Sequence, residues 1–389
     1  MKKSIIILAL IVIIIKVNAQ WQQTNCPIMS INCLSIKGSG IFTGTNGNGA
    51  YLSLNGGSSW TAINHNLAST DVLSFVIKGD TIFTGTENGV FWSPDNGTNW
   101  TAANVGLPTD PYVYALVISE NNIFAGIAFG GGVYLSSNNG STWATVNTGL
   151  ADTMVTSLII NGSSIFTGTF GGGVYLSSNN GSSWVAVNTG LGNDTVWSFA
   201  TKGDTIFAGT YNGVYLSSDN GSSWESAGLS DEYITSFVIS GSDIFAGTFG
   251  GGVYLSSDNG GSWTTVNTGL SDNATYIYAL AISDDTIFAG TDAAGVWKQS
   301  LSQVTGIKEI DDNRSNFSIY PNPVNDYIII NTNDIDKKDF EIFDSFGNLV
   351  FKNRIIDQKQ KIGLSLLSGM YLCRFNDFNT KPQKFIVVK

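Results

Sequence analysis

The stretch that decides the fold reads IFAGTFGGGVYLSSDNGGSW and spans residues 244–263. Its opening phrase, Ile-Phe-Thr/Ala-Gly, occurs seven times, and the six intervals between copies average 41 residues. Its closing phrase, S-x-D/N-x-G-x-x-W, occurs six times between those copies, and we call these segments the box turns. The opening phrases begin at Ile41, Ile82, Ile123, Ile165, Ile206, Ile244 and Ile287; the box turns are residues 53–60, 93–100, 136–143, 177–184, 217–224 and 256–263. Such a period identifies one structural unit copied along the chain.

Each unit is predicted to form four short β-strands. Runs of about five β-branched and aromatic residues alternate with Gly, Asn and Asp, which is typical of strands joined by tight turns. The segment from Trp21 to Gln303 shows no helical periodicity. Units of about 40 residues with four strands are propeller blades. The sequence therefore predicts an all-β chain whose residues 20–303 form a seven-bladed β-propeller.

The two ends of the array complement each other. The seventh unit contains Val296-Trp297-Lys298 but has no box turn and no outer strand after it. Residues Trp21 to Asn25 match the W-x-x-x-N pattern that opens the outer strand in other units, as from Trp60 to Asn64. We expect the N-terminal segment to complete the last blade and to cover its free edge.

The first nineteen residues are predicted to be a signal peptide. Lys2 and Lys3 precede an apolar run from Ser4 to Ile15, and Val17-Asn18-Ala19 places small residues at a cleavage site. The alternative is an uncleaved membrane anchor. A twelve-residue helix rises only about 18 Å, however, and a bilayer core is about 30 Å thick.

Composition excludes several classes of function. Nineteen basic residues stand against 30 acidic ones, a net charge of −11, which argues against a nucleic-acid partner. One His and three Cys predict neither a metal site nor a cofactor. The spacing of Cys26 and Cys33 permits a disulfide in an exported protein, but Cys33 also aligns with a column of small residues on the inner strands, which favours a buried thiol.

The box turns resemble the Asp-box of the sialidase and bacterial-neuraminidase-repeat superfamily, with Asn in place of Asp in three copies. We expect the Ser and Asp side chains to accept backbone N–H bonds within the turn and the Trp ring to pack beneath it. A metal site at Asp95, Asp219 and Asp258 is the alternative, but one carboxylate per turn is far too few for Ca²⁺. Sialidase activity requires a cluster of three arginines, and this chain has no Arg before Arg314.

Aromatic residues gather where the inner strands begin, and we call this candidate binding surface the mouth. It is predicted to contain Tyr112, Tyr114, Trp197, Tyr233, Tyr276 and Tyr278. The loops between second and third strands should add Phe129, Phe170, Tyr211 and Phe249 on the same face. Aromatic rings beside polar groups suit sugars or extended peptides. The alternative is that these rings serve only to pack one blade against the next.

The last part of the chain differs in composition. A polar linker at residues 304–316 precedes a segment, residues 317–389, whose alternating strands and turns predict a small β-sandwich. This segment resembles the type A C-terminal sorting domain of the type IX (Por) secretion system. The residues that carry the resemblance are Tyr320, Pro321, Asn322, Pro323, Gly347, Gly369, Tyr371 and Lys389.

The resemblance implies export through the periplasm and across the outer membrane by the type IX machinery. It further implies removal of the domain by a sortase-like peptidase, which leaves the cargo on surface lipopolysaccharide or releases it. We therefore expect an extracellular or cell-surface protein that binds a glycan or protein ligand without catalysis, and we assign it no catalytic residue. The alternatives are a glycan-active hydrolase with a carboxylate pair on the propeller face and a structural surface protein without a ligand.

Overall fold

The computed structural model describes residues 20–27, 29–304, 317–321, 324, 326–332, 339–344, 349–355, 357–375 and 383–387. The predicted signal peptide and most of the predicted linker lie outside these residues. The chain divides into two compact units, Met1–Gly306 and Ile307–Lys389, and each is described separately.

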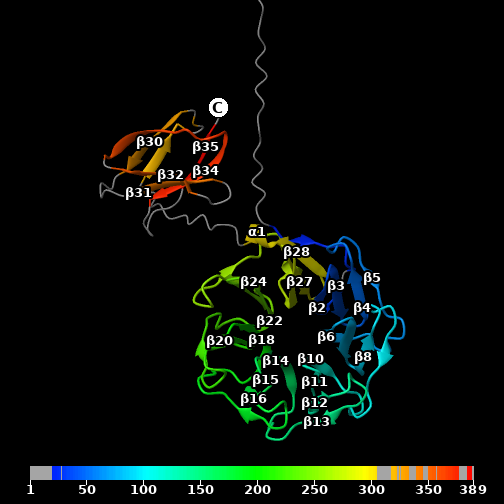
Figure 1. Ribbon diagram of the computed structural model, residues 1–389. Helices are drawn as coiled ribbons and strands as arrows, with labels where there is room; N and C mark the ends of the chain where they lie inside the picture. Colours follow the sequence, from blue (N-terminus) through cyan, green and yellow to red (C-terminus); the bar gives the residue numbers. More distant parts are fainter. Residues whose placement is uncertain are drawn as a thin grey trace, which may run out of the picture. The chain divides into compact units, whose positions relative to one another are not determined.

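The first unit is a β-propeller, and its described residues form seven four-stranded antiparallel sheets arranged in a ring (Figure 1). The innermost strands of blades one to seven are β2 (Ile31–Lys37), β6 (Val72–Lys78), β10 (Val113–Ser119), β14 (Val155–Asn161), β18 (Val196–Lys202), β22 (Ile234–Ser240) and β26 (Ile277–Ser283). The second strands are β3 (Gly40–Thr45), β7 (Thr81–Thr86), β11 (Asn122–Ile127), β15 (Ser164–Thr169), β19 (Thr205–Thr210), β23 (Asp243–Thr248) and β27 (Thr286–Thr291).

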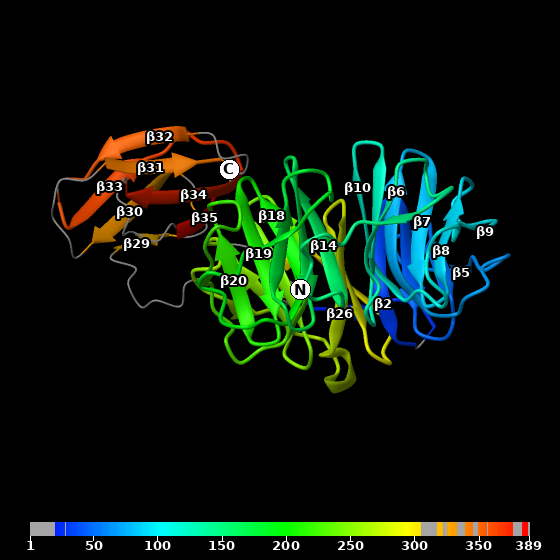
Figure 2. The same ribbon diagram turned by 90° about the horizontal axis from the view of Figure 1, so that it is seen from below.

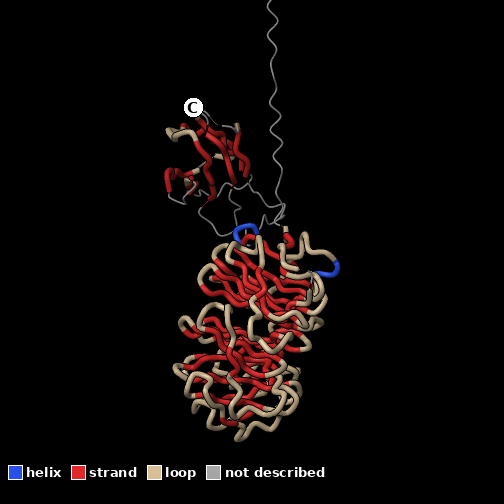
Figure 3. The backbone as a smooth tube through the Cα atoms, turned by 90° about the vertical axis from the view of Figure 1, so that its right-hand side faces the viewer, coloured by secondary structure: helices blue, strands red, loops and turns tan. Residues whose placement is uncertain are grey.

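The third strands are β4 (Ala50–Ser53), β8 (Gly89–Ser93), β12 (Gly132–Ser136), β16 (Val174–Ser177), β20 (Gly213–Ser217), β24 (Gly252–Ser256) and β28 (Val296–Ser300). The outer strands are β5 (Thr61–Ala62), β9 (Thr101–Ala102), β13 (Ala144–Thr145), β17 (Val185–Ala186), β21 (Glu225–Ser226), β25 (Thr264–Thr265) and, for blade seven, β1 (Gln22–Gln23). Figure 2 shows β6 to β9 side by side as one blade. Helix is confined to η1 (Asp272–Ala274) and α1 (Leu301–Val304) in the described part of the propeller (Figure 3).

The ring closes as the sequence predicts. β1 pairs antiparallel with β28, so that Gln22 lies opposite Lys298 and the last blade gains its fourth strand from the N-terminus. Trp21 is almost fully buried and donates its indole N–H to the Val266 carbonyl of blade six at 2.6 Å. Because closure joins the two ends of the array, the seventh blade has four strands like the others and β28 is not left as an edge strand.

The box-turn tryptophans hold neighbouring blades together. The indole N–H of Trp100 donates to Ile63 O of the preceding blade at 2.6 Å, and that of Trp143 donates to Ala103 O at 2.7 Å. The same bond recurs at Trp184, Trp224 and Trp263. The expectation that each ring merely packs beneath its own turn is therefore incomplete, because the sequence pattern could not show which blade supplies the acceptor.

The glycine of the repeated Ile-Phe-Thr/Ala-Gly phrase permits close packing of the inner strands. A Cβ atom on Gly85 would lie 2.6 Å from Val113 O and 2.7 Å from Val113 Cγ1 of the next blade. Gly44, Gly126, Gly168, Gly209, Gly247 and Gly290 meet the next inner strand in the same way. Any larger residue would force the blades apart, since such contacts are far inside van der Waals distance.

The second unit is a small β-sandwich of two sheets. One sheet is formed by β29 (Phe317–Tyr320), β30 (Tyr327–Thr332) and β33 (Lys359–Gly363). The other has the order β32 (Leu349–Arg354), β31 (Asp339–Phe343), β34 (Gly369–Phe375) and β35 (Gln383–Val387). Its core contains Phe317, Phe340 and Phe375, whose rings contact one another edge to face at centroid distances of 5.0–6.0 Å. The predicted sandwich is confirmed.

Candidate functional site

A β-bulge near the start of each inner strand shapes the candidate site. In every blade the register between the first two strands shifts by one residue at this point, which leaves one inner-strand residue unpaired. The bulged residues are Asn32, Leu73, Tyr114, Thr156, Trp197, Thr235 and Tyr278. A bulge re-aims its side chain out of the regular alternation of a strand. Three of the six predicted mouth residues, Tyr114, Trp197 and Tyr278, are therefore bulged residues.

The polar bulge residues have a role in the fold. Asn32 donates to Val72 O of the next inner strand at 3.2 Å. Thr156 and Thr235 donate in the same way to Val196 O and Ile277 O of the blades that follow. The three aromatic bulge residues make no hydrogen bond of this kind within the described residues, and the buried indole nitrogen of Trp197 has no partner there. The fold therefore explains the polar bulge residues but not the choice of aromatic ones.

Seven aromatic rings form a continuous surface across blades four to seven, which we call the mouth patch. Phe170 contacts Trp197 at a centroid distance of 5.8 Å, and Trp197 contacts Tyr233 at 5.4 Å. Tyr233 contacts Phe249 at 5.6 Å, and Phe249 contacts Tyr276 at 4.9 Å. The patch is completed by Tyr211, against Tyr233, and Tyr278, against Phe249. These contacts link successive blades.

The mouth patch is open to solvent. Phe170, Tyr211, Phe249 and Tyr276 are exposed by 39–57%, whereas Trp197, Tyr233 and Tyr278 are half-buried. Packing between blades explains the ring contacts but not this exposure. Contiguous exposed apolar surface on a soluble protein marks an interaction site more often than scattered single residues do.

Tyr112 and Tyr114 belong to a second, smaller group on blade three. Tyr112 contacts Tyr114 at 6.0 Å and Phe129 at 5.3 Å, and Phe129 is 71% exposed. Among the described residues no ring contact joins this group to the mouth patch, but the two groups interact electrostatically. Burial raises the pKa of Tyr233, and the nearby hydroxyls of Tyr278 and Tyr114 raise it further. The structure therefore brings together four of the six predicted residues, Trp197, Tyr233, Tyr276 and Tyr278, directly or through Phe249, and places Tyr112 and Tyr114 in the blade-three group.

The remaining part of the mouth is acidic. Tyr112 donates its hydroxyl to Glu87 Oε2 at 3.4 Å, and Asp71 accepts a bond from the Gly47 amide. Partial burial, and then the neighbouring Asp71 carboxylate, raises the pKa of Glu87 above its ordinary 4.5.

On blade seven, Asp292 accepts a hydrogen bond from Ser30 Oγ at 2.8 Å. Burial and then the charge of Asp292 raise the pKa of Tyr278. Acidic residues beside the aromatic rings were not singled out from the sequence, where they resembled ordinary turn residues.

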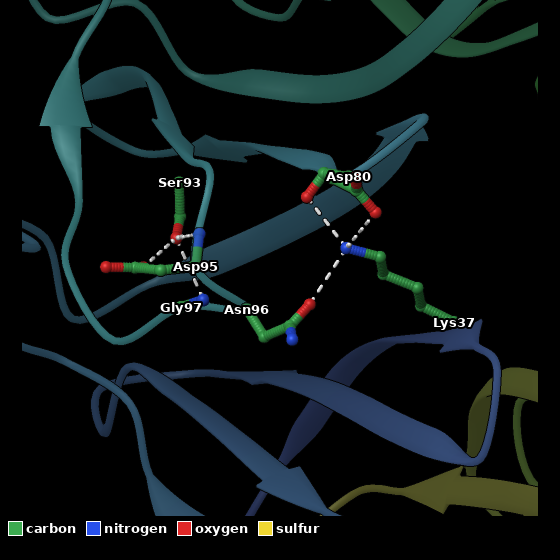
Figure 4. Close-up of polar contacts among 6 residues, drawn as sticks. All are labelled: Lys37, Asp80, Ser93, Asp95, Asn96 and Gly97. Atoms are coloured by element: carbon green, nitrogen blue, oxygen red, sulfur yellow. Dashed lines mark hydrogen bonds and ion pairs between the residues drawn. The ribbon is translucent and has the colours of Figure 1, made fainter.

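The box turns lie on the opposite face, where their polar groups are occupied within the turn (Figure 4). Gly97 N donates to Ser93 Oγ at 2.8 Å, and the Ser93 hydroxyl donates to Asp95 Oδ1 at 2.7 Å. Hydrogen bonds from Asn99 and Ser93 hold the pKa of Asp95 at about 2. Among the described residues no group of three His, Cys, Asp or Glu side chains could hold a metal ion. These contacts are those expected of a turn-stabilising motif.

Lysines on this second face bind the neighbouring blade. Lys37 donates to Asp80 O at 2.7 Å and to Asn96 Oδ1 at 2.8 Å (Figure 4). Lys78 and Lys202 make the equivalent pairs of bonds, and Lys298 donates to Gly56 O. A cavity of about 520 Å³ also opens on this face, between blades two and three, and Trp92, Asn138 and Ser141 contribute to its lining. It lies away from the mouth.

Cys26 and Cys33 are reduced thiols with no disulfide between them, and burial raises the pKa of each to about 12. No helix among the described residues is long and apolar enough to cross a membrane.

Half of the predicted sorting-motif residues fall within the described sandwich. Tyr371 is buried and donates its hydroxyl to Leu367 O at 3.0 Å, while Gly369 begins β34. Tyr320 ends β29 and lies beneath Lys359 Nζ at 5.7 Å, with Pro321 next to it. Asn322, Pro323, Gly347 and Lys389 lie outside the described residues.

Two family models match the chain. Residues 318–389 match the secretion system C-terminal sorting domain, and residues 35–157 and 147–299 match the DUF6242 beta propeller domain. Together the two propeller matches cover more than half of the chain. Among curated proteins, none matches the sequence.

Solved structures share the fold at low identity. PorZ, a surface component of the type IX secretion system of Porphyromonas gingivalis, is 17% identical with a TM-score of 0.57 over 92% of this chain. The chain spans only 59% of PorZ, less than two thirds of its length. YCF48 from Cyanidioschyzon merolae is 14% identical with a TM-score of 0.57, covering 72% of this chain and 99% of its own. A GH74 enzyme of Niastella koreensis is 16% identical with a TM-score of 0.55, covering 70% and 43%.

Proposed function

This chain belongs to the DUF6242 β-propeller family and ends in a secretion system C-terminal sorting domain, and from that premise we propose that it is a non-catalytic binding module. The sorting domain directs export by the type IX system to the cell surface or the extracellular space. Its cargo is the propeller, and the mouth patch with the adjoining blade-three rings is its binding site. A sortase-like peptidase removes the sorting domain and leaves the propeller on surface lipopolysaccharide or free.

The observation that carries this proposal is the exposure of a connected aromatic surface where the fold requires none. The inner strands need a bulge, and Asn or Thr at the bulge binds the next blade. Blades three, five and seven have Tyr114, Trp197 and Tyr278 there instead, next to exposed loop aromatics. Rings with polar groups around them form the usual lining of recognition sites for sugars and peptides.

The hydrolase alternative finds little support in the geometry. Asp71 and Glu87 are an acidic pair beside the aromatic rings: after burial, the charge of Asp71 raises the pKa of Glu87, and Tyr112 donates its hydroxyl to Glu87 Oε2 at 3.4 Å. Glycosidases hold their carboxyls about 5–10 Å apart so that the scissile bond fits between them. The cavity of about 520 Å³ lies on the opposite face, away from these two carboxyls. Propellers with this fold include both a GH74 enzyme and a YCF48 solved bound to D1 peptide, so the fold alone does not decide the matter.

The test is an array of glycans, polysaccharides and synthetic peptides probed with the purified protein. The Tyr112→Ala, Trp197→Ala, Tyr278→Ala variant is expected to lose binding while it remains folded. The control is Leu54→Ala with Val185→Ala, since these side chains are 69% and 64% exposed away from the mouth. Binding that survives in the mouth variant contradicts the proposal. Hydrolysis of any bound glycan would favour the alternative.

A further inference from the structure

The mouth face, which carries the loops that enter the inner strands and the loops between second and third strands, bears negative charge only. Its acidic residues, taken over the described propeller, are Asp71, Glu87, Asp110, Asp152, Asp194, Asp231, Glu232, Asp272 and Asp292. Each precedes an inner strand or lies in a loop between second and third strands. The four propeller lysines all lie on the opposite face, where neighbouring blades bind their ammonium groups. No cation of the described propeller therefore offsets the charge of the mouth face.

Acidic residues adjoin the aromatic rings around the mouth. The rings extend over blades three to seven, while Asp71 and Glu87 lie on blade two and Asp292 lies on blade seven. Glu87 accepts the Tyr112 hydroxyl, and Asp292 raises the pKa of Tyr278 and Asp71 that of Tyr114, in both cases after burial. A ligand on the rings therefore lies close to carboxylates.

We propose that the mouth binds an extended, basic polypeptide segment, in which lysine or arginine residues alternate with apolar or aromatic ones. This inference rests on the proposed function and specifies its ligand. Apolar side chains would lie on the exposed rings, and the cations would pair with Asp71, Glu87 and Asp292. Cations also bind the faces of tyrosine and tryptophan rings directly. Acidic glycans and other anions would be repelled, and a neutral glycan would donate hydroxyl hydrogen bonds to the carboxylates but would not neutralise their charge.

The pair formed by Asp71 and Glu87 suits a cation in particular. After burial, the charge of Asp71 raises the pKa of Glu87, which shows that the two carboxylates repel each other, and a cation bound between them would relieve that repulsion. A lysine ammonium or an arginine guanidinium would pair with both carboxylates. Tyr112, the other group that faces Glu87, donates its hydroxyl and favours the ionised carboxyl.

Isothermal titration calorimetry with three peptides tests the inference. The probe is acetyl-Gly-Lys-Leu-Lys-Tyr-Lys-Leu-Lys-Gly-amide, compared with the same peptide in which every Lys is Gln or every Lys is Glu. We expect the Lys peptide to bind about tenfold or more tightly than the Gln peptide, and the Glu peptide not to bind. Raising NaCl from 0.05 to 0.5 M should remove most of that difference, since the Debye length becomes shorter than the span of the site.

Two charge variants locate the effect. Asp71→Asn, Glu87→Gln, Asp292→Asn should bind the Lys peptide no better than the Gln peptide. Asp80→Asn, Asp204→Asn, Asp284→Asn changes the net charge equally on the opposite face, at exposed positions, and should keep the preference. Equal binding of the Lys and Gln peptides, or equal loss in both variants, overturns the inference. If glycans bind, the Tyr112→Ala, Trp197→Ala, Tyr278→Ala variant loses glycan binding, and no peptide binds, then the inference fails and the proposed function stands. If the aromatic variant keeps all binding, both fail.

Discussion

The same substitution, made at Trp143 and at Trp197, distinguishes a tryptophan that packs the blades from one that is free for recognition. Trp143 is almost fully buried and donates its indole N–H to Ala103 O of the preceding blade at 2.7 Å. Trp197 is half-buried, and its indole nitrogen has no partner among the described residues. At either site Trp→Phe removes the indole N–H and reduces the side-chain volume by the same amount. At Trp143 it also leaves a buried carbonyl unsatisfied, which costs about 1–3 kcal/mol.

We therefore expect Trp143→Phe to lower the free energy of unfolding by about 1–3 kcal/mol more than Trp197→Phe does. Thermal unfolding followed by circular dichroism measures the difference, since 1 kcal/mol corresponds to about 2–4 °C in Tm for domains approaching this size. Ligand binding at the mouth should change in the opposite order, with Trp143→Phe unaffected. If Trp197→Phe proves as destabilising as Trp143→Phe, the propeller itself requires Trp197, and the argument that the mouth aromatics are free for recognition is refuted.

Three further predictions concern charge, packing and export. Affinity for the Lys peptide should fall as pH drops through the raised pKa of Glu87, above 4.5, because protonation removes a negative charge; Glu87→Gln should abolish this step in a calorimetric pH series. Gly85→Ala should destabilise the propeller by about 3 kcal/mol, because its Cβ would lie 2.6 Å from Val113 O. The control Gly79→Ala meets no atom within 4 Å and should cost only about 1 kcal/mol for its φ of +59°, as measured by denaturant unfolding. Deletion of residues 317–389 should retain the protein in the periplasm, and its detection by cell fractionation at the surface would contradict the assigned role of the sorting domain.

Much of the fold can be predicted because the same pattern of strands and turns occurs seven times in the sequence. One blade's pattern of strands and turns could be accidental, but seven aligned copies fix the strand order, and the unmatched Trp21 segment fixes closure. The repeat could not show the hydrogen-bond partner of each polar group that recurs from blade to blade. The box-turn Trp and the inner-strand Lys bind neighbouring blades, and a pattern within one unit carries no information on which unit supplies the acceptor.

The candidate site was predicted less completely than the fold. Aligning the blades found Trp197, Tyr233, Tyr276 and Tyr278, which contact one another through Phe249 or directly. The bulge that re-aims Tyr114, Trp197 and Tyr278 leaves no mark in the sequence, because an unpaired strand residue looks like its neighbours. The acidic residues of the mouth were missed for a similar reason, since Asp71 and Asp292 occupy turn positions where carboxylates are common.

A ring of near-identical blades must still produce an asymmetric site, and the bulge provides the means. Seven bulges present seven side chains at equivalent places near the starts of the inner strands, and the glycine paired with the residue after each bulge lets the next blade pack closely whatever that side chain is. Three of the seven, Asn32, Thr156 and Thr235, bind the next blade. The others can vary without cost to ring closure, because the box-turn tryptophans and the inner-strand glycines already join the blades. Recognition can therefore change at these positions while stability is maintained elsewhere, which is why substitutions at the mouth should alter binding far more than unfolding.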